Sequence, residues 1–273
     1  MYYLFNKKIL VCYLITKFDN KKNLSIFIKN YLNFDSGHPH DLLICFKLLD
    51  EDQIRIFKKA LININYIEYI DKYNKNDFDL GSYSRVASDY STRFIFFLNS
   101  YSYPICDKWL NKITKNYEEN SILATSASYG SLLSLIKLKK IYKFLNYYLK
   151  LIKYKKIFNP FPNPHIRTTG FLIKANDYIN FMNNKLIKTK EDAWKIESGK
   201  NSLTNYFKKL NFNIFVINSD GKRFSENEWK LSKTYNYLDQ NKSIISDKHI
   251  RKYFLLNKTK KIKFQINTWG EEG

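Results

Sequence analysis

Several residue types that are rare in this chain gather in one short stretch, residues 159–173, with the sequence NPFPNPHIRTTGFLI. Three of the five prolines lie there at alternating positions, and His165 and Arg167 follow them directly. Alternating prolines stiffen an extended backbone, so they would hold both side chains firmly at the entrance to the next strand. There the two cations could neutralise a leaving diphosphate, or His165 could bind a metal ion instead. A purely structural role for both side chains is the alternative.

Three carboxylates, Glu191, Asp192 and Glu197, lie close together further along the chain, with Trp194 between them. One of them could act as a general base that takes the proton from an acceptor hydroxyl, and we slightly favour Asp192 over Glu197. Trp194 could stack on a sugar ring. The alternative is that these acids only cover the surface of a helix that ends in a turn at ESGK.

A turn near residue 80 could bind a nucleotide. It contains Asp79 and Gly81 and follows a predicted strand, and Arg85 comes about one helical turn later. Asp79 could accept hydrogen bonds from a ribose or a base, while Gly81 allows close backbone approach where a helix N-terminus favours an anion. The alternative for Asp79 is that it only caps the helix.

Two further polar segments follow predicted strands. Asn99 and Ser100, in the sequence NSYS, stand where a nucleotide-sugar enzyme often has carboxylates that hold Mn²⁺ or Mg²⁺ against a diphosphate. Their neutral oxygens predict at best a weak metal site, so metal use stays open, with His165 and Asn99 as candidate ligands. Lys222 and Arg223, in NSDGKRF, are candidate phosphate contacts, and a solvated turn is the alternative.

The elements that must position these residues are short apolar runs that alternate with helical spacing. Buried strands are predicted at 9–15, 41–46, 65–71, 93–100, 121–128, 168–173 and 212–217, and most are separated by a helical segment. This alternation predicts one α/β domain with a mostly parallel sheet flanked by helices. Ligands of such sheets bind beyond the carboxyl ends of the strands, where Asp79, Asn99 and Lys222 are expected.

A long helical pattern at residues 132–158 interrupts this alternation with eight lysines and no acid. Its apolar residues recur every three or four positions, for example at Leu135, Leu145 and Ile152. Such a helix could lie on an anionic membrane, or it could pack its apolar face on the core and leave its lysines in water. No apolar run approaches the ~18 residues that a membrane span needs.

The predicted domain has four parts: a nucleotide-binding half at about 1–130, the basic helical insertion at 131–158, an acceptor and catalytic half at 159–224, and an extension at 225–273. The extension is polar and weakly patterned, and it offers four polar candidates without a recognisable pattern: Asp239, Asp247, His249 and Arg251.

Charge and cysteine usage limit the classes of partner. The formal charge of +21 suggests nucleic acid or an anionic membrane, but only six of the 46 basic residues are Arg, which nucleic-acid proteins favour for bidentate contacts. The lysines are spread along the chain and no recognised motif for reading nucleic acid is present, so nucleic acid is an alternative rather than the expected partner.

Cys12, Cys45 and Cys106 form no zinc pattern, which favours reduced thiols and a cytoplasmic protein. If the basic helix binds lipid, we expect the protein to be peripheral at the inner face of the membrane.

Taken in order, six segments resemble a small bacterial glycosyltransferase with a GT-A-type fold, related to the family-2-like enzymes of surface polysaccharide synthesis. The segments are DFDLGSYSR, FLNSYS, FPNPHIRTTGFLI, EDAWKIESGKNSLT, SDGKRF and DQNKSIISDKHIR, and FDLGSY also resembles a turn of the rhamnan-synthesis type. The resemblance implies a nucleotide-sugar donor and a saccharide or lipid-linked acceptor. It implies that Asp79 and Arg85 contact the nucleoside, that residues 99–102 occupy the metal and diphosphate position, and that His165 and Arg167 lie near the diphosphate or the acceptor. Asp192 is then the base.

The chain departs from that pattern because it has no Asp-x-Asp. Either other groups bind Mn²⁺ or Mg²⁺, or the cations Arg167, Lys222 and Arg223 replace the metal, or the chain is an inactive transferase-like assembly protein.

Overall fold

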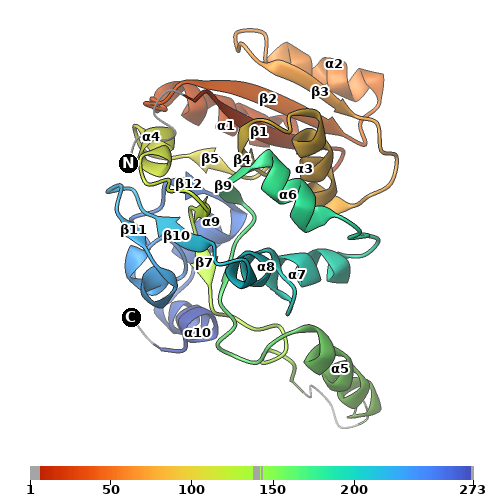
Figure 1. Ribbon diagram of the computed structural model, residues 1–273, viewed down its shortest axis with the longest axis vertical. Helices are drawn as coiled ribbons and strands as arrows, with labels where there is room; N and C mark the ends of the chain where they lie inside the picture. The colour runs from red at the N-terminus through yellow and green to blue at the C-terminus, as the bar shows by residue number, and fades with distance from the viewer. Residues whose placement is uncertain (1–6, 138–141, 143, 272–273) are drawn as a thin grey trace.

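The computed structural model describes residues 7–137, 142 and 144–271, and its centre is a mixed sheet of eight strands (Figure 1). The strand order is β11-β10-β6-β9-β4-β1-β2-β3. These strands are β1 (Ile9–Thr16), β2 (His40–Lys47), β3 (Ile67–Asp71), β4 (Phe94–Leu98), β6 (Ser121–Ala124), β9 (Gly170–Lys174), β10 (Asn213–Ile217) and β11 (Arg223–Phe224). β9 runs antiparallel to β4 and β6, and β11 to β10, while the other neighbours are parallel. The predicted α/β fold with a mostly parallel sheet is confirmed.

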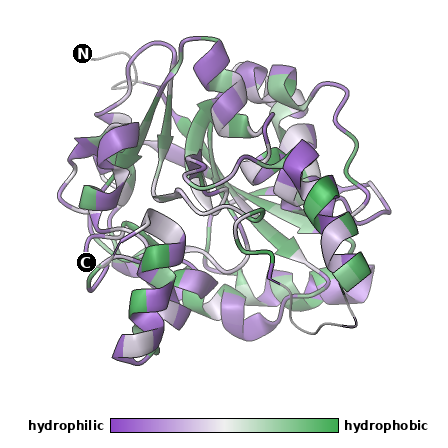
Figure 2. Ribbon diagram, turned by 90° about the horizontal axis from the view of Figure 1, so that it is seen from below, coloured by the Kyte–Doolittle hydropathy of each residue, from purple (hydrophilic) through white to green (hydrophobic). Residues whose placement is uncertain are grey.

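Helices cover both faces of the sheet. One face packs on α1 (Lys21–Asn33), α2 (Glu51–Ala60) and α4 (Trp109–Thr114), and the other on α3 (Phe78–Asp89), α6 (Ala175–Met182), α7 (Lys190–Ser198) and α8 (Leu203–Lys209). Val11 points to the first face and Cys12 to the second, so β1 needs the unbroken run of buried residues that it has from Ile9 to Ile15. Figure 2 shows hydrophobic residues concentrated on the central strands.

Two elements have bounds in the structure that differ from those predicted from the sequence. The strand expected at 121–128 divides into β6 and β7 (Ala127–Ser128), because β7 leaves the sheet to pair with β8 (His165–Ile166). The helix expected from Gly81 begins at Phe78, so Asp79 lies in its first turn.

The insertion and the extension differ more from expectation. Of the long helix predicted over 132–158, the structure has α5 (Phe144–Ile157), while residues 138–141 and 143 lie outside the described part. The weakly patterned extension is ordered as a 3-10 segment, η2 (Glu226–Ser232), and as β12 (Ile245–Ser246), α9 (Lys248–Phe254) and α10 (Lys258–Trp269). β12 pairs with β5 (Tyr103–Pro104), which brings the extension against the segment that follows β4. Over the residues that the structure describes, no helix is both long enough and apolar enough to span a bilayer.

Candidate functional site

A buried cluster of charges fixes the segment between β3 and α3. The ammonium of Lys47, at the end of β2, bonds to the carboxylate of Asp77 and donates to Ser82 Oγ at 2.9 Å. Arg85 donates from Nε and Nη2 to the two carboxylate oxygens of Asp71, both at 2.6 Å, and from Nη1 to Asp77 at 2.7 Å. Two cations thus meet two carboxylates, and paired, hydrogen-bonded charges of this kind tolerate burial.

This cluster explains two residues that we predicted to bind a nucleotide. A Cβ on Gly81 would lie 1.9 Å from the Asp77 carboxylate, so the glycine makes room for the cluster. Arg85 points into the same cluster, and neither residue lines the two cavities described next. Both residues therefore support the first turn of α3, where Asp79 lies.

A cavity of 380 Å³ lies beyond the carboxyl end of β4, and we call it the sheet-edge cavity. Its walls come from the first turn of α3, the segment after β4, the residues between β8 and β9, one face of α7, and the start of α9. Asp79 and Asn99 line it, as the sequence predicts. This position, next to the central strand β1 where the strand order reverses, is where α/β sheets bind ligands.

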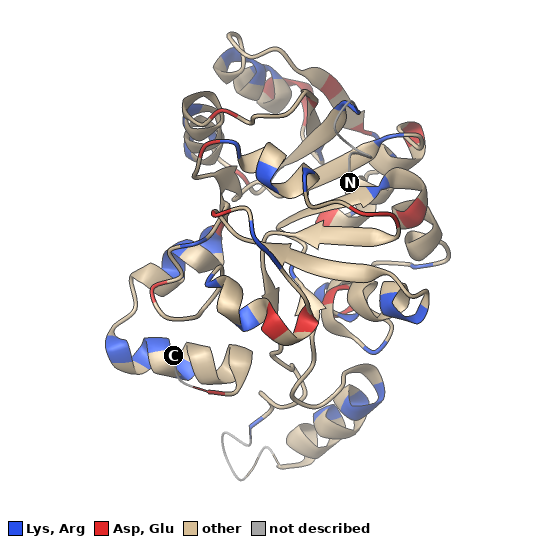
Figure 3. Ribbon diagram, turned by 60° about the vertical axis from the view of Figure 1, so that its left-hand side comes forward, with Lys and Arg blue, Asp and Glu red and all other residues tan. Residues whose placement is uncertain are grey.

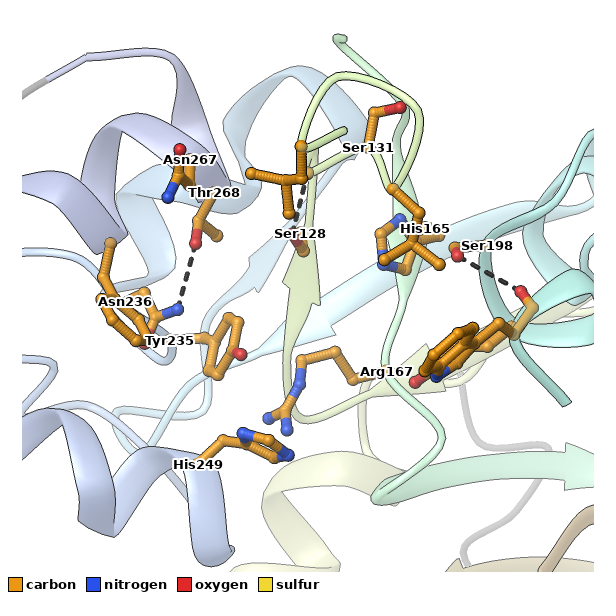
Figure 4. A pocket seen from close by; sticks show the side chains of 16 residues that line it. Ser128, Ser131, His165, Arg167, Ser198, Tyr235, Asn236, His249, Asn267 and Thr268 are labelled. Carbon is orange, nitrogen blue, oxygen red and sulfur yellow. Dashed lines mark hydrogen bonds between the residues drawn. The ribbon is translucent and has the colours of Figure 1, made fainter. Parts of the chain in front are cut away.

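A second cavity of 440 Å³, the outer cavity, adjoins the first (Figure 4). Arg167, Trp194, Glu197 and His249 line both cavities, so these four side chains form the boundary between them. The outer cavity adds His165, as well as Ser128 after β6 and residues of the extension such as Tyr235.

Glu197 is the carboxylate at this boundary. Its Oε1 accepts hydrogen bonds at 3.4 Å from the backbone nitrogen and the hydroxyl of Thr168. Burial and then the charge of Glu197 raise the pKa of Asp79 to about 6. The charge of Glu197, on α7, therefore acts on the carboxyl group of Asp79, on α3, and both residues line the sheet-edge cavity.

Asp79→Asn is expected to stabilise the protein above about pH 6 and to have no such effect near pH 4. Because the folded pKa lies above its ordinary value, the folded state holds the proton more tightly, so the Asp79 contribution to stability falls as pH rises from about 4 to about 6. The neutral amide removes a penalty of about 1–2 kcal/mol, after discounting for partial exposure. Thermal unfolding near pH 4 and above pH 6 measures the change in stability. The control is Glu51→Gln, at an exposed position on α2. Equal effects at both pH values would contradict it.

Arg167 is the central cation of the site. Its Nη1 donates to the Asp247 carboxylate at 2.5 Å, and its guanidinium lies 3.9 Å from the centre of the Tyr235 ring. Burial opposes the charged form of Asp247, but the charge of Arg167 and this hydrogen bond outweigh it and lower the pKa of Asp247. Figure 4 shows the Arg167 side chain directed towards Tyr235 and His249. The guanidinium is thereby fixed and charged at the boundary.

Burial disfavours the charged form of both histidines of the site, since it lowers the pKa of His165 and of His249 below the ordinary imidazole value. Nδ1 of His165 also lies 2.8 Å from the carbonyl oxygen of Asn163. Of the predicted pair of cations, Arg167 is therefore the one whose charge the site favours, while the environment of His165 favours the neutral imidazole.

Two of the three acids near Trp194 do not line either of these cavities. Asp192 forms a capping box with Thr189 at the start of α7, and hydrogen bonds from Thr189 and Lys195 outweigh slight burial to lower its pKa to about 2. Glu191 pairs with Lys153 at 2.9 Å on the surface. Asp192, which we favoured as the base, is instead placed where it stabilises its own helix.

Lys222 and Arg223 also lie away from these cavities. Both are exposed, and Arg223 pairs with Glu118 at 2.7 Å. The sheet-edge cavity has two other lysines, Lys190 and Lys248, which sequence reasoning missed. Their ammonium groups lie 5.4 Å and 5.3 Å from the ring centres of Trp194 and Tyr101, respectively.

The residues after β4 do not fit a divalent metal ion. Oδ1 of Asn99 already accepts from the nitrogen of Tyr101 at 3.2 Å and from the hydroxyl of Ser102 at 2.8 Å. The carbonyl of Ser100 accepts from the Tyr13 hydroxyl at 2.8 Å. Within residues 7–137, 142 and 144–271, no group of three or more His, Cys, Asp or Glu side chains could hold a metal. The segment therefore offers no carboxylate and no open set of ligands.

No family model matches this chain, and no curated protein matches its sequence. Among solved structures, a mannosyltransferase from Pyrobaculum calidifontis in complex with GDP-Man and Mn²⁺ matches with a TM-score of 0.47 and 7% identity, over 86% of this chain and 63% of that one. The 4-diphosphocytidyl-2C-methyl-D-erythritol synthase of Anaerococcus prevotii matches with a TM-score of 0.46 and 11% identity, over 77% and 88%. The glycosyltransferase GlyE of Streptococcus pneumoniae matches with a TM-score of 0.43 and 12% identity, over 76% and 45%. At these values the likeness is distant and says nothing of substrate or chemistry.

Proposed function

We propose that this protein is a glycosyltransferase that moves a sugar from a nucleotide-sugar donor to a saccharide or lipid-linked acceptor in the synthesis of cell-surface glycans. The observation that carries the proposal is the pair of adjoining cavities whose boundary holds one carboxylate, Glu197, and one fixed cation, Arg167. A transfer reaction needs two substrates that meet at a base, and the two cavities provide a binding place for each substrate on either side of Glu197. The ordered resemblance of the sequence segments to glycosyltransferases supports the same function.

The donor is assigned to the sheet-edge cavity. Asp79 and Phe78, in the first turn of α3, are close enough to the carboxyl edge of the sheet to contact a ribose and a base. Arg167, Lys190 and Lys248 line the same cavity and would meet the negative charge of the diphosphate. In this assignment side-chain cations act where the resemblance implies a metal, and Lys190 and Lys248 take the phosphate-binding role that was predicted for Lys222 and Arg223.

The acceptor is assigned to the outer cavity. Trp194 and Tyr235 supply aromatic surfaces on which a sugar ring can stack, and Ser128 and His165 supply hydrogen-bonding groups. Because Trp194 also lines the sheet-edge cavity, it lies between the two substrates. This keeps the predicted acceptor role of Trp194.

In the proposed step, an acceptor hydroxyl attacks the anomeric carbon of the donor sugar. The new bond joins the acceptor oxygen to that carbon, the bond from the carbon to the diphosphate oxygen breaks, and the electron pair leaves with the nucleoside diphosphate. Glu197 takes the hydroxyl proton, and Arg167 stabilises the charge of the leaving group. Asp247 holds the Arg167 guanidinium in place as a positioning residue.

Isothermal titration calorimetry with UDP-, GDP-, TDP- and CMP-sugars, each with and without Mn²⁺, tests donor binding. We expect one nucleotide class to bind without a requirement for the metal, because the cavity presents three cations and no metal ligand set. Lys248→Gln should weaken that binding, whereas Lys222→Gln, an exposed lysine away from these cavities, should leave it unchanged. Absence of binding by every donor under both conditions would overturn the proposal.

A further inference from the structure

The helix α5 exposes a continuous apolar strip to solvent. Figure 1 shows this helix projecting from the body of the protein. The strip consists of five side chains that are 39–67% exposed: Phe144, Leu145, Tyr148, Leu149 and Ile152. Their spacing of one, three or four positions places them on one side of the helix. An exposed apolar face of this extent, on an element that projects from the fold, marks an interaction surface.

The C-terminal end of α5 is attached to the rest of the protein, and Lys153 there pairs with Glu191 of α7. Tyr154 and Phe158 are buried, with ring centres 5.1 Å apart, and the backbone nitrogen of Lys200 donates to the carbonyl of Ile157 at 2.8 Å. The apolar strip lies before this anchor. The expectation that the helix packs its apolar face on the core is therefore wrong for residues 144–152, which remain exposed apart from two half-buried positions, Tyr147 and Leu151.

The charge of the same segment is entirely positive. α5 contains Lys150, Lys153, Lys155 and Lys156 and no acidic residue. In Figure 3 this helix carries the blue of its lysines and none of the red that marks Asp and Glu. Lys155 and Lys156 are exposed at the end of the apolar strip, so a surface that contacts the strip also meets these cations.

We propose that α5 docks on an anionic lipid bilayer, with the apolar strip in the interface and the lysines on the headgroups. A helix that combines exposed Leu, Phe and Tyr side chains with lysines has the composition of interfacial membrane helices. The alternative occupant, α5 of a second copy, would bring the same lysines against each other, because the segment holds no acid to offset them.

Docking would also place the outer cavity near the membrane. Leu132 and Leu135 line that cavity and belong to the segment that leads towards α5. If the proposed function is correct, a lipid-linked acceptor could enter the outer cavity from the bilayer. The docking itself does not depend on the proposed function.

Co-sedimentation of the full chain with vesicles of pure phosphatidylglycerol or of pure phosphatidylcholine tests the docking. We expect binding to the anionic vesicles, weakened by salt, and little binding to the neutral ones. Lys155→Gln with Lys156→Gln should reduce the partition coefficient about thirtyfold, since each lysine near an anionic surface contributes about 1 kcal/mol. Leu145→Ser with Leu149→Ser should reduce it by about tenfold or more.

Matched controls exclude general effects of charge and hydrophobicity. Lys21→Gln with Lys22→Gln, on the exposed start of α1, and Ile62→Ser with Leu255→Ser, at sites 81% and 87% exposed, should leave vesicle binding unchanged. Equal binding by the α5 variants and the parent chain would overturn the proposal, and so would no binding to anionic vesicles. An α5-dependent dimer in sedimentation velocity without vesicle binding would assign the strip to a second copy.

The docking and the proposed function can fail separately. Calorimetric titration with the soluble donor should give the same affinity for the α5 variants and the parent chain. Vesicle binding without any donor binding would leave the docking intact and reject the transferase function.

Discussion

Glu197→Gln is expected to lower the rate of sugar transfer by about 10²–10⁴-fold and to leave donor affinity almost unchanged. The amide keeps the size and the hydrogen-bond acceptor that Thr168 uses, but it cannot take a proton from the acceptor hydroxyl. The measurement is the initial rate of transfer, or of donor hydrolysis where no acceptor is known, together with calorimetric donor binding on the same samples.

Asp192→Asn is the matched control for this substitution. It makes the same chemical change on the same helix, but at a side chain that lines neither the sheet-edge nor the outer cavity, so the transfer rate should stay close to that of the parent chain. Loss of activity in Asp192→Asn together with full activity in Glu197→Gln would restore Asp192 as the base. If donor turnover is identical in both variants and in the parent, neither carboxylate is the base.

Lys47→Met is expected to reduce the free energy of unfolding by about 3–5 kcal/mol, the cost of leaving part of a buried ion cluster unpaired. Lys47 is 1% exposed and meets the carboxylate of Asp77, with Asp71 3.9 Å away, so its loss leaves two buried carboxylates with Arg85 alone. Urea unfolding measures the change. Donor affinity should also fall, because the cluster positions the turn that carries Asp79.

The control for this prediction is Lys22→Met, which makes the same substitution at an exposed position on α1 and should change stability little. An unfolding free energy for Lys47→Met within experimental error of the Lys22→Met value would show that the cluster does not hold the fold together at β2 and α3.

Most of the central sheet could be predicted from the sequence because its strands are buried on both sides. β1 and β2 contain continuous apolar runs, at residues 9–15 and 42–46, and the predicted bounds of the two strands differ from the structure by at most one residue at each end. The antiparallel insertion of β9 between β4 and β6 could not be predicted, because strand pairing depends on contacts between residues far apart in the chain. The domain divisions remain predictions.

The candidate site was predicted only in part. Asp79, Asn99, Arg167 and Trp194 do line the cavities, but Asp192 was favoured over Glu197 although helical geometry distinguishes them. Lys190, Trp194 and Glu197 follow one another at spacings of four and three residues, which places them on one face of α7, whereas Asp192 lies off that face. Applying this spacing to the sequence would have selected Glu197 and added Lys190.

The sequence names Asp247 and His249 of the extension as polar candidates, but it could not predict that they line the same cavity as Asp79 and Arg167. Asp247, His249 and Lys248 enter the site because β12 pairs with β5, a contact between segments about 140 residues apart, which no local pattern records. The exposure of the apolar strip on α5 was likewise undecided, because an apolar helical face in a sequence does not show whether the core or an external surface covers it.

A crystal structure of the protein with the best-binding nucleotide sugar tests the central claim most directly. We predict that the nucleotide lies in the sheet-edge cavity, with its diphosphate beside Arg167, Lys190 or Lys248, and that the anomeric carbon faces Glu197 at the boundary with the outer cavity. A nucleotide bound outside the sheet-edge cavity, or an anomeric carbon directed away from Glu197, would contradict the proposed site and its mechanism.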